Sequence, residues 1–399
     1  MDLKPRRLIK KIFLNFLLLV ITSALLISCE DNPNNLGITF ITSDTTSTRY
    51  LDSQVDSMQI TYNNYKKFIN TSTATSIMVG NYNGYTSKAL MEFSSIGPEF
   101  DSAKIVSAVL TMRYNDYFFK DEKGLTSFNI FRVNNDLNFS TITFDSVNSS
   151  NIGTVSMGNF SGTPVDTSKI SVALNNQFVK DWLEYAADST YPVKNFGFMI
   201  APDMSSSTIK GFYSFNNSTD FIPKIDIIII KNGEFDTLNL VTSTYVTLSD
   251  APTSVIPADR FMLQNGIAFR NILRFDLTKL PPNVIINNAT IEFTLDNAGS
   301  YITSTTDKSI YLGMVLDSIA KRDSLATRVF PLDSIRYSAS STSINSLVQR
   351  WNSGVLPNFG ISMQNFSEIE NLDNFVFYTP TAADITKRPR LKITYTLRN

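Results

Sequence analysis

The chain has 399 residues, a formal net charge of −1 and 18% charged residues, so it lacks the excess of Lys and Arg that nucleic-acid binding requires. It contains no histidine, which excludes Ser-His-Asp and Cys-His catalysis and the usual histidine-rich zinc, copper and iron sites. Carboxylate chemistry and calcium held by oxygen ligands stay open.

The first 28 residues have the pattern of a secretion signal. The mostly apolar run from Ile12 to Ile27 follows a basic segment that contains Lys4, Arg6, Arg7, Lys10 and Lys11. The run is interrupted by polar residues and is shorter than the roughly 20 apolar residues of a membrane-spanning helix. The pattern therefore predicts a signal peptide over residues 1–28.

The run ends in Leu26-Ile27-Ser28-Cys29, which resembles a lipobox. This resemblance implies that Cys29, the only cysteine, carries the lipid (a diacylglycerol and a further acyl chain such as palmitate) and begins the mature protein. Several acyl chains give a stable membrane anchor, where one chain binds reversibly. The alternative is a spanning anchor with a chance cysteine.

Residues 29–40 are polar and turn-prone, so we expect a lipidated tether. Glu30 and Asp31 directly follow the cysteine and resemble the surface-export tag of certain Gram-negative bacteria. The alternative is an ordinary acidic linker. The tag would place the protein in the outer membrane, lipid-anchored and facing the cell exterior.

From residue 41 onward the sequence predicts an all-β fold. Segments such as Val109–Tyr114 and Leu391–Tyr395 alternate apolar and polar residues, and Gly, Asn, Asp, Ser and Pro clusters separate them. Antiparallel strands in domains of this size usually close into two-layer sandwiches. Short helices are expected only at Gln177–Ala187 and Ser343–Trp351.

An internal repeat runs through this region. The only two tryptophans, Trp182 and Trp351, each precede an Asn-Phe-Gly, at residues 195–197 and 358–360. Matching strand patterns stand upstream and downstream in the same order. We expect each tryptophan to be buried at the end of a sandwich, with the Asn-Phe-Gly turning the chain into the next strand.

The repeat predicts two tandem β-domains, a first at residues 41–232 and a second at residues 233–399. The joint between them is expected near residues 231–236, with Gly233 at its centre.

The second repeat carries the motifs of a known family. A strand that ends in Phe, Leu273-Arg274-Phe275-Asp276-Leu277, is followed by a Pro-containing turn, Leu280-Pro281-Pro282. A strand that begins with Ala comes next, Ala289-Thr290-Ile291-Glu292-Phe293, and then the Trp with its Asn-Phe-Gly. The repeat ends with an Arg-Pro strand, Arg388-Pro389-Arg390-Leu391-Lys392-Ile393. This order resembles the DNRLRE (disaggregatase-related) domain of secreted bacterial proteins. The first repeat departs from it at Ser94-Ser95-Ile96 and at Ile222.

The resemblance implies two tandem jelly-roll-like β-sandwiches. Some members of the family are carbohydrate-binding modules beside polysaccharide-degrading enzymes. The family's landmarks are chiefly structural, so the resemblance assigns no ligand-binding residues.

Carbohydrate sites need aromatic faces that stack on sugar rings and polar groups that meet the hydroxyls. Tyr117, Phe118 and Phe119 stand in a polar stretch, Asn115–Gly124, which we interpret as a loop. They are the candidate ligand-binding residues. The alternative is that these side chains fold over the end of the sandwich.

Metal and catalytic sites have weaker signals. Asp116, Asp121 and Glu122 lie close in sequence and could hold a structural calcium ion, although no EF-hand pattern occurs. No defined pair of acids or activated nucleophile is evident, so no catalytic residue and no other cofactor is predicted.

The sequence favours a non-catalytic surface lipoprotein that binds extracellular polysaccharide. One alternative is a structural or adhesive surface protein that binds another protein through the outer faces of its sandwiches. The other is a glycan-degrading enzyme that uses carboxylates.

We predict that Cys29→Ser leaves an uncleaved, unacylated precursor, because the lipid forms a thioether with this thiol. Metabolic labelling with a palmitate analogue checks this, and the wild-type chain is the positive control. Label on the Cys29→Ser protein would contradict the prediction.

Overall fold

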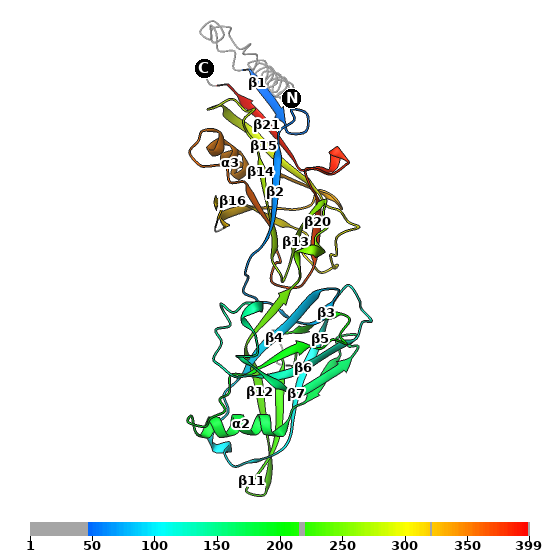
Figure 1. Ribbon diagram of the computed structural model, residues 1–399, viewed down its shortest axis with the longest axis vertical. Coiled ribbons are helices and arrows are strands. Elements are labelled where there is room, and N and C mark those ends of the chain that lie inside the picture. Colours follow the sequence, from blue (N-terminus) through cyan, green and yellow to red (C-terminus); the bar gives the residue numbers. More distant parts are fainter. Residues whose placement is uncertain (1–46, 215–219, 320, 398–399) are drawn as a thin grey trace, which may run out of the picture. The chain divides into compact units, whose positions relative to one another are not determined.

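The computed structural model describes residues 47–214, 220–319 and 321–397. The expected signal peptide, the lipid-attachment residue Cys29 and the tether lie outside these residues. Within them, antiparallel strands and two short α-helices form an all-β fold, as the sequence predicts (Figure 1). Neither helix is long and apolar enough to cross a membrane. By their contacts, the described residues from Thr48 onward belong to one unit.

One set of strands encloses a hydrophobic core around Trp182, and we call it the N-terminal lobe. Its elements are β3 (Ser76–Tyr82), β4 (Tyr85–Phe93), β5 (Lys104–Phe119), β6 (Thr126–Val133), β7 (Ile152–Gly162), β8 (Lys169–Ala173), α2 (Asn176–Ala187), β9 (Phe198–Pro202), β10 (Ile209–Tyr213), β11 (Lys224–Lys231) and β12 (Glu234–Asp250).

A second core contains Trp351, and we call its elements the C-terminal lobe. They are β1 (Thr48–Asp52), β2 (Ile60–Lys66), β13 (Arg260–Gln264), β14 (Phe269–Phe275), β15 (Ile285–Thr294), β16 (Ile310–Asp317), β17 (Arg322–Val329), β18 (Arg336–Ser340), α3 (Thr342–Asn352), β19 (Ile361–Asn365), β20 (Asn374–Tyr378) and β21 (Arg390–Thr396). Single 3-10 turns lie at Pro98–Phe100, Phe144–Ser146, Thr253–Val255 and Ile385–Lys387.

The order of strand pairing is the same in both lobes. In the C-terminal lobe, a four-stranded sheet, β1-β21-β15-β18, is accompanied by the sheet β17-β16-β19-β14-β13-β20, with β2 added to β14. In the N-terminal lobe, β12-β11-β5-β8 and β7-β6-β9-β4-β3-β10 follow the same plan. There the two layers join into one sheet, because β5 and β12 are long enough to pair in both.

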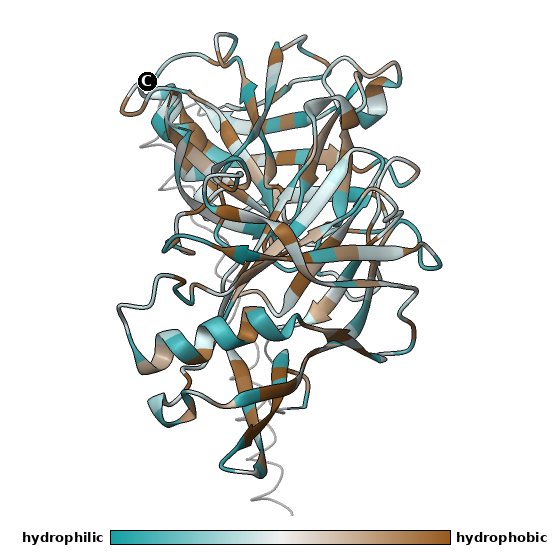
Figure 2. Ribbon diagram, turned by 60° about the horizontal axis from the view of Figure 1, so that its bottom comes forward, coloured by the Kyte–Doolittle hydropathy of each residue, from teal (hydrophilic) through white to brown (hydrophobic). Residues whose placement is uncertain are grey.

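Alternating residues explain why these strands form layers with an apolar interior. In β15, Ala289, Ile291 and Phe293 are buried in the core of the lobe, while Thr290 and Glu292 are only partly buried. Figure 2 shows the same alternation of hydrophobic and hydrophilic residues along many strands. Side chains with a period of two put one apolar face on each strand, and two such faces bury each other.

The two helices lie within one residue of their predicted positions. Asn175 caps α2 by accepting a hydrogen bond from the Gln177 N–H, and Ser341 caps α3 in the same way. Trp182 in α2 and Trp351 in α3 are buried, as expected, with exposed fractions of 1% and 7%. Each helix therefore closes its lobe with a large aromatic side chain.

Each Asn-Phe-Gly forms the same tight turn before the next strand. Gly197 and Gly360 have φ angles of 76° and 96°, which favour glycine. A Cβ atom on Gly197 would lie 2.0 Å from the carbonyl oxygen of Met91 in β4, and one on Gly360 would lie 2.6 Å from that of Leu273 in β14. The two turns thus face equivalent strands, which supports the predicted repeat.

The strand pairing does not follow the expected boundary between residues 232 and 233. Strands β1 and β2 pair with β21 and β14 of the C-terminal lobe, and Figure 1 shows the blue β1 beside the red β21. Strand β12 lies beyond the expected boundary, yet it pairs with β11 and β4 of the N-terminal lobe. The lobes are therefore residues 76–250, and residues 48–66 together with 260–397.

Gly233 is a hairpin residue rather than the joint between two domains. Asn232 and Gly233 connect β11 to β12 with φ angles of 55° and 87°. An Asn-Gly pair with two positive φ angles is the preferred two-residue turn between antiparallel strands. The turn therefore continues the N-terminal lobe.

We predict that Trp182→Ala lowers the free energy of unfolding by about 3–5 kcal/mol, because it removes a buried indole that packs on Phe178 and Phe198. Urea unfolding followed by circular dichroism measures the change. Phe235→Ala is the control, since this side chain is 72% exposed and its loss should change stability by less than about 0.5 kcal/mol. Equal losses in the two variants would contradict the prediction.

Candidate functional site

The predicted aromatic residues lie at the end of a strand, so the expected loop at residues 115–124 is wrong for its first half. Strand β5 runs to Phe119 and pairs with β10 throughout its last part. Phe212 of β10 lies opposite Tyr114, but Lys210 lies opposite Phe118, so β5 bulges between them. Asp116, with a φ angle of 67°, takes up the extra length.

The bulge changes the direction of the side chains that follow it. Tyr114, before the bulge, packs in the core of the N-terminal lobe, whereas Tyr117 and Phe119, after it, pack in a separate cluster. That cluster, which we call the junction cluster, combines residues of both lobes: Met78, Tyr85, Tyr117, Phe119, Ile209, Ala251, Met262, Ile267, Phe269, Leu372 and Val376. Tyr117 and Phe119 are thus buried where the lobes meet, which agrees with the alternative interpretation of these aromatics.

Phe118 is half-buried and belongs to the same region. Its carbonyl oxygen accepts a hydrogen bond of 2.6 Å from the Tyr301 hydroxyl of the C-terminal lobe. Its ring lies 5.5 Å from the ammonium nitrogen of Lys210. The three predicted ligand-binding residues therefore connect the lobes instead of forming an exposed aromatic surface.

A buried hydrogen-bond network holds this junction. The Tyr117 hydroxyl donates to Asp373 Oδ1 over 3.0 Å and accepts a bond of 3.0 Å from the Leu372 N–H. Burial and the neighbouring Asp373 carboxylate raise the pKa of Tyr117 well above its usual value, so the phenol keeps its proton. Asp373 Oδ2 accepts two further bonds, from the backbone and hydroxyl of Thr303.

Beside the junction cluster lies a cavity of about 570 Å³, which we call the polar cleft. Both lobes line it, with residues Thr75, Ser76, Asn115, Tyr117, Tyr213, Thr305, Thr306, Ser367, Glu370 and Asn371. Every one of these side chains carries a hydroxyl, an amide or a carboxylate. Of these residues, only Tyr117 is a candidate in the sequence analysis, because the lining comes from separate segments of the chain that the fold brings together.

Three pairs of polar residues in the cleft are hydrogen-bonded to each other. Asn115 donates to the Ser76 hydroxyl over 2.5 Å, and Asn371 donates to the Thr306 hydroxyl over 2.7 Å. Glu370 Oε2 accepts bonds of 2.9 and 2.6 Å from the backbone and hydroxyl of Thr75. A ligand would therefore meet groups whose orientation is already set, which lowers the entropic cost of binding.

One aromatic ring of the cleft is partly exposed. Tyr213, the last residue of β10, has its ring 5.0 Å from that of Phe221, and the Arg113 guanidinium lies 4.7 Å above Phe221. Phe221 thus packs against one side of the Tyr213 ring. The cleft combines a partly exposed tyrosine ring with hydroxyl and amide groups.

Lys210 is a second feature that the sequence does not reveal. Its side chain is fully buried, and its ammonium group donates to the carbonyl oxygens of Glu122 and Pro164 and lies 3.4 Å from the Tyr114 hydroxyl. Burial lowers its pKa, which nearby acidic residues, Glu122 first, counteract. Lys210 ties the loop after β5 to β10 and so supports the wall of the junction.

The residues considered for calcium do not converge in the structure. Asp116 lies at the bulge of β5 and is exposed, while Asp121 uses Oδ1 to accept a bond from the Lys123 N–H. Within residues 47–214, 220–319 and 321–397, no three acidic side chains are grouped so that they could hold a metal ion.

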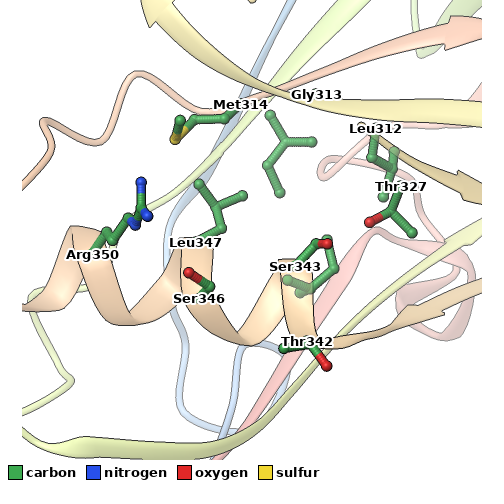
Figure 3. Close-up of a pocket in the computed structure, with 11 residues that line it drawn as sticks. Leu312, Gly313, Met314, Thr327, Thr342, Ser343, Ser346, Leu347 and Arg350 are labelled. Carbon is green, nitrogen blue, oxygen red and sulfur yellow. The ribbon is translucent and has the colours of Figure 1, made fainter. Parts of the chain in front are cut away.

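A second cavity, of about 320 Å³, lies between α3 and β16 (Figure 3). Leu347 points from the helix toward the strand that carries Leu312 and Met314, and Arg350 lies near one end. Leu312, Leu347 and Ile361, which line it, belong to the core of the C-terminal lobe. Its lining contains no aromatic ring on which a sugar could stack, so this cavity is less suited to bind a glycan than the polar cleft.

The chain matches no family model, and comparison with curated proteins and with solved structures found no match. The resemblance to the DNRLRE domain therefore stays a prediction, and the chemistry of the polar cleft is the basis for a function.

We predict that Tyr117→Phe lowers the free energy of unfolding by about 1–3 kcal/mol, because it leaves Asp373 Oδ1 without its hydroxyl donor and the Leu372 N–H without an acceptor in a buried site. Tyr82→Phe is the matched control, since its ring also packs on Phe119 and its hydroxyl makes no hydrogen bond within the described residues. Urea unfolding of both variants checks this, and an unchanged midpoint for Tyr117→Phe would refute it.

Proposed function

We propose that the protein is a non-catalytic lipoprotein of the outer membrane that is anchored through Cys29, faces the cell exterior and binds polysaccharide in the polar cleft. The observation that carries the proposal is the lining of the cleft, where the ring of Tyr213, packed against Phe221, lies among hydroxyl and amide groups. Extracellular glycans are the polymers that a surface lipoprotein meets.

The chemistry of the cleft suits a sugar. The C–H face of a pyranose ring stacks on an aromatic ring, and the sugar hydroxyls exchange hydrogen bonds with amides, hydroxyls and carboxylates. Tyr213 offers the ring, and Asn115, Asn371 and Glu370 offer the polar partners. Affinity should be modest, because each sugar hydroxyl gives up a bond to water for each bond to the protein.

The same lining argues for binding without cleavage. Hydrolysis of a glycosidic bond by carboxylates uses a pair of acids on either side of it. Glu370 is the one carboxylate among the residues that line the cleft, and it already accepts two bonds from Thr75. The chain has no histidine that could replace the second acid.

Exposed apolar side chains favour the adhesive alternative. Phe330 and Leu332, which follow β17, are 59% and 67% exposed. Contiguous patches of exposed apolar side chains often mark contacts with another protein, and these two residues lie close together in sequence. The experiment below separates the two functions.

Affinity electrophoresis of the mature chain from Glu30 through gels with neutral and anionic polysaccharides tests the proposal. We expect retention by at least one polymer, and about tenfold weaker retention of Tyr213→Ala, because the variant loses the stacking ring. Tyr311→Ala is the control, since this partly buried tyrosine lies on β16 outside the cleft and should leave retention unchanged.

Absence of retention by every polymer would reject glycan binding, and capture of a protein without any glycan would favour the adhesive function. Shortening of a polymer during incubation would point to an enzyme. The experiment uses the whole mature chain, because a cut at residue 236 would remove most of β12 from the N-terminal lobe and also the part of the cleft that the C-terminal lobe lines.

A further inference from the structure

Each lobe is completed by a strand from the other repeat. In chain order, the first repeat runs from β1 to β11 and the second from β12 to β21. Strands β1 and β2 nevertheless pair with β21 and β14 of the second repeat. Strand β12 pairs with β11 and β4 of the first repeat.

The two exchanged strands occupy equivalent positions. Thr61 of β2 lies opposite Arg274 of β14, and Thr244 of β12 lies opposite Glu92 of β4. Each threonine precedes a tyrosine that packs against the core of the lobe that receives it. Arg274 and Glu92 are equivalent in turn, because each precedes the final phenylalanine of its strand. Both lobes therefore have the same seam for the same kind of strand.

The strands meet where the chain passes between the lobes. The last residue of β2, Lys66, forms an ion pair of 2.5 Å with the last residue of β12, Asp250. The connections that follow, residues 67–75 and residues 251–259, are equal in length. Two equivalent strand ends thus meet at the point where two similar units exchange strands within one chain.

We propose that residues 48–66 are an exchangeable strand and that a second copy of this chain can accept it. In the resulting dimer, β1 and β2 of each copy pair with β21 and β14 of the other. The partner is a second copy because its C-terminal lobe has the seam that already fits this strand.

Exchange between copies rebuilds the strand contacts of the single chain, so the hinge decides how often it occurs. Residues 67–75 must leave their contacts, which include a bond of 2.8 Å from Asn70 to the Phe139 carbonyl and a bond of 2.7 Å from the Thr71 hydroxyl to the Thr247 carbonyl. At low protein concentration the strand should stay in its own chain, because its effective concentration there is high. At high protein concentration, exchange with a second copy should increase.

The experiment uses the chain from Glu30 to Asn399, which lacks Cys29 and is therefore free of cysteine. One preparation carries Thr61→Cys and the other Arg274→Cys, two exposed positions that face each other in the strand pair. The two are mixed, unfolded in urea, refolded together at several protein concentrations and oxidised. We expect a disulfide-linked dimer on a non-reducing gel, with a yield that rises with protein concentration.

The matched control mixes Thr61→Cys with Glu92→Cys, the equivalent position on β4, which pairs with β12 and not with β2. This pair reports chance collisions and should give only a background of dimer. A third chain with both Thr61→Cys and Arg274→Cys should form an internal disulfide at low concentration, which shows that the variants fold with β2 in place. The proposal is wrong if the Thr61→Cys and Arg274→Cys mixture gives no more dimer than the control at any concentration.

Discussion

Backbone pairing between distant parts of the chain is the constraint on which this structure depends. The C-terminal lobe is completed only when β1 and β2, from the start of the described chain, pair with β21 and β14. The N-terminal lobe in turn requires β12. The chain must therefore cross between the lobes twice, and the C-terminal lobe is built from two separate segments of the sequence.

The two crossings explain why the lobes share a polar site. The second connection contributes Ala251 to the junction cluster, where the Tyr117 hydroxyl and the Asp373 carboxylate form a buried bond between the lobes. The first connection ends at Thr75, which lines the polar cleft. A buried carboxylate is tolerated only when its oxygens are well satisfied, and Thr303 fulfils this for the second oxygen. The same segments then place their remaining hydroxyls and amides around the polar cleft.

Local patterns predicted the all-β class, both helices and both Asn-Phe-Gly turns, because each depends on neighbours in sequence: alternation, a cap, or a glycine with positive φ. The bulge at Asp116 was missed, since two polar residues inside an apolar strand look like the start of a loop, and the bulge decides where Tyr117 points. The strand exchange was missed because Asn232-Gly233 signals a turn without stating which strands it joins. Nine of the ten residues that line the cleft were missed, because only the fold brings their segments together.

The place where the chain enters its fold determines how it would carry a mechanical load. Residue 48 opens β1, so an anchor at Cys29, as proposed, would pull on the first strand of the C-terminal lobe. A polymer that pulled on the N-terminal side of the polar cleft, which Thr75 and Ser76 line, would load the other end of the path, beyond β2. Hydrogen bonds between antiparallel strands lie perpendicular to the strand direction. Tension along β1 and β2 would therefore load their bonds to β21 and β14 together, in shear, instead of opening them one after another.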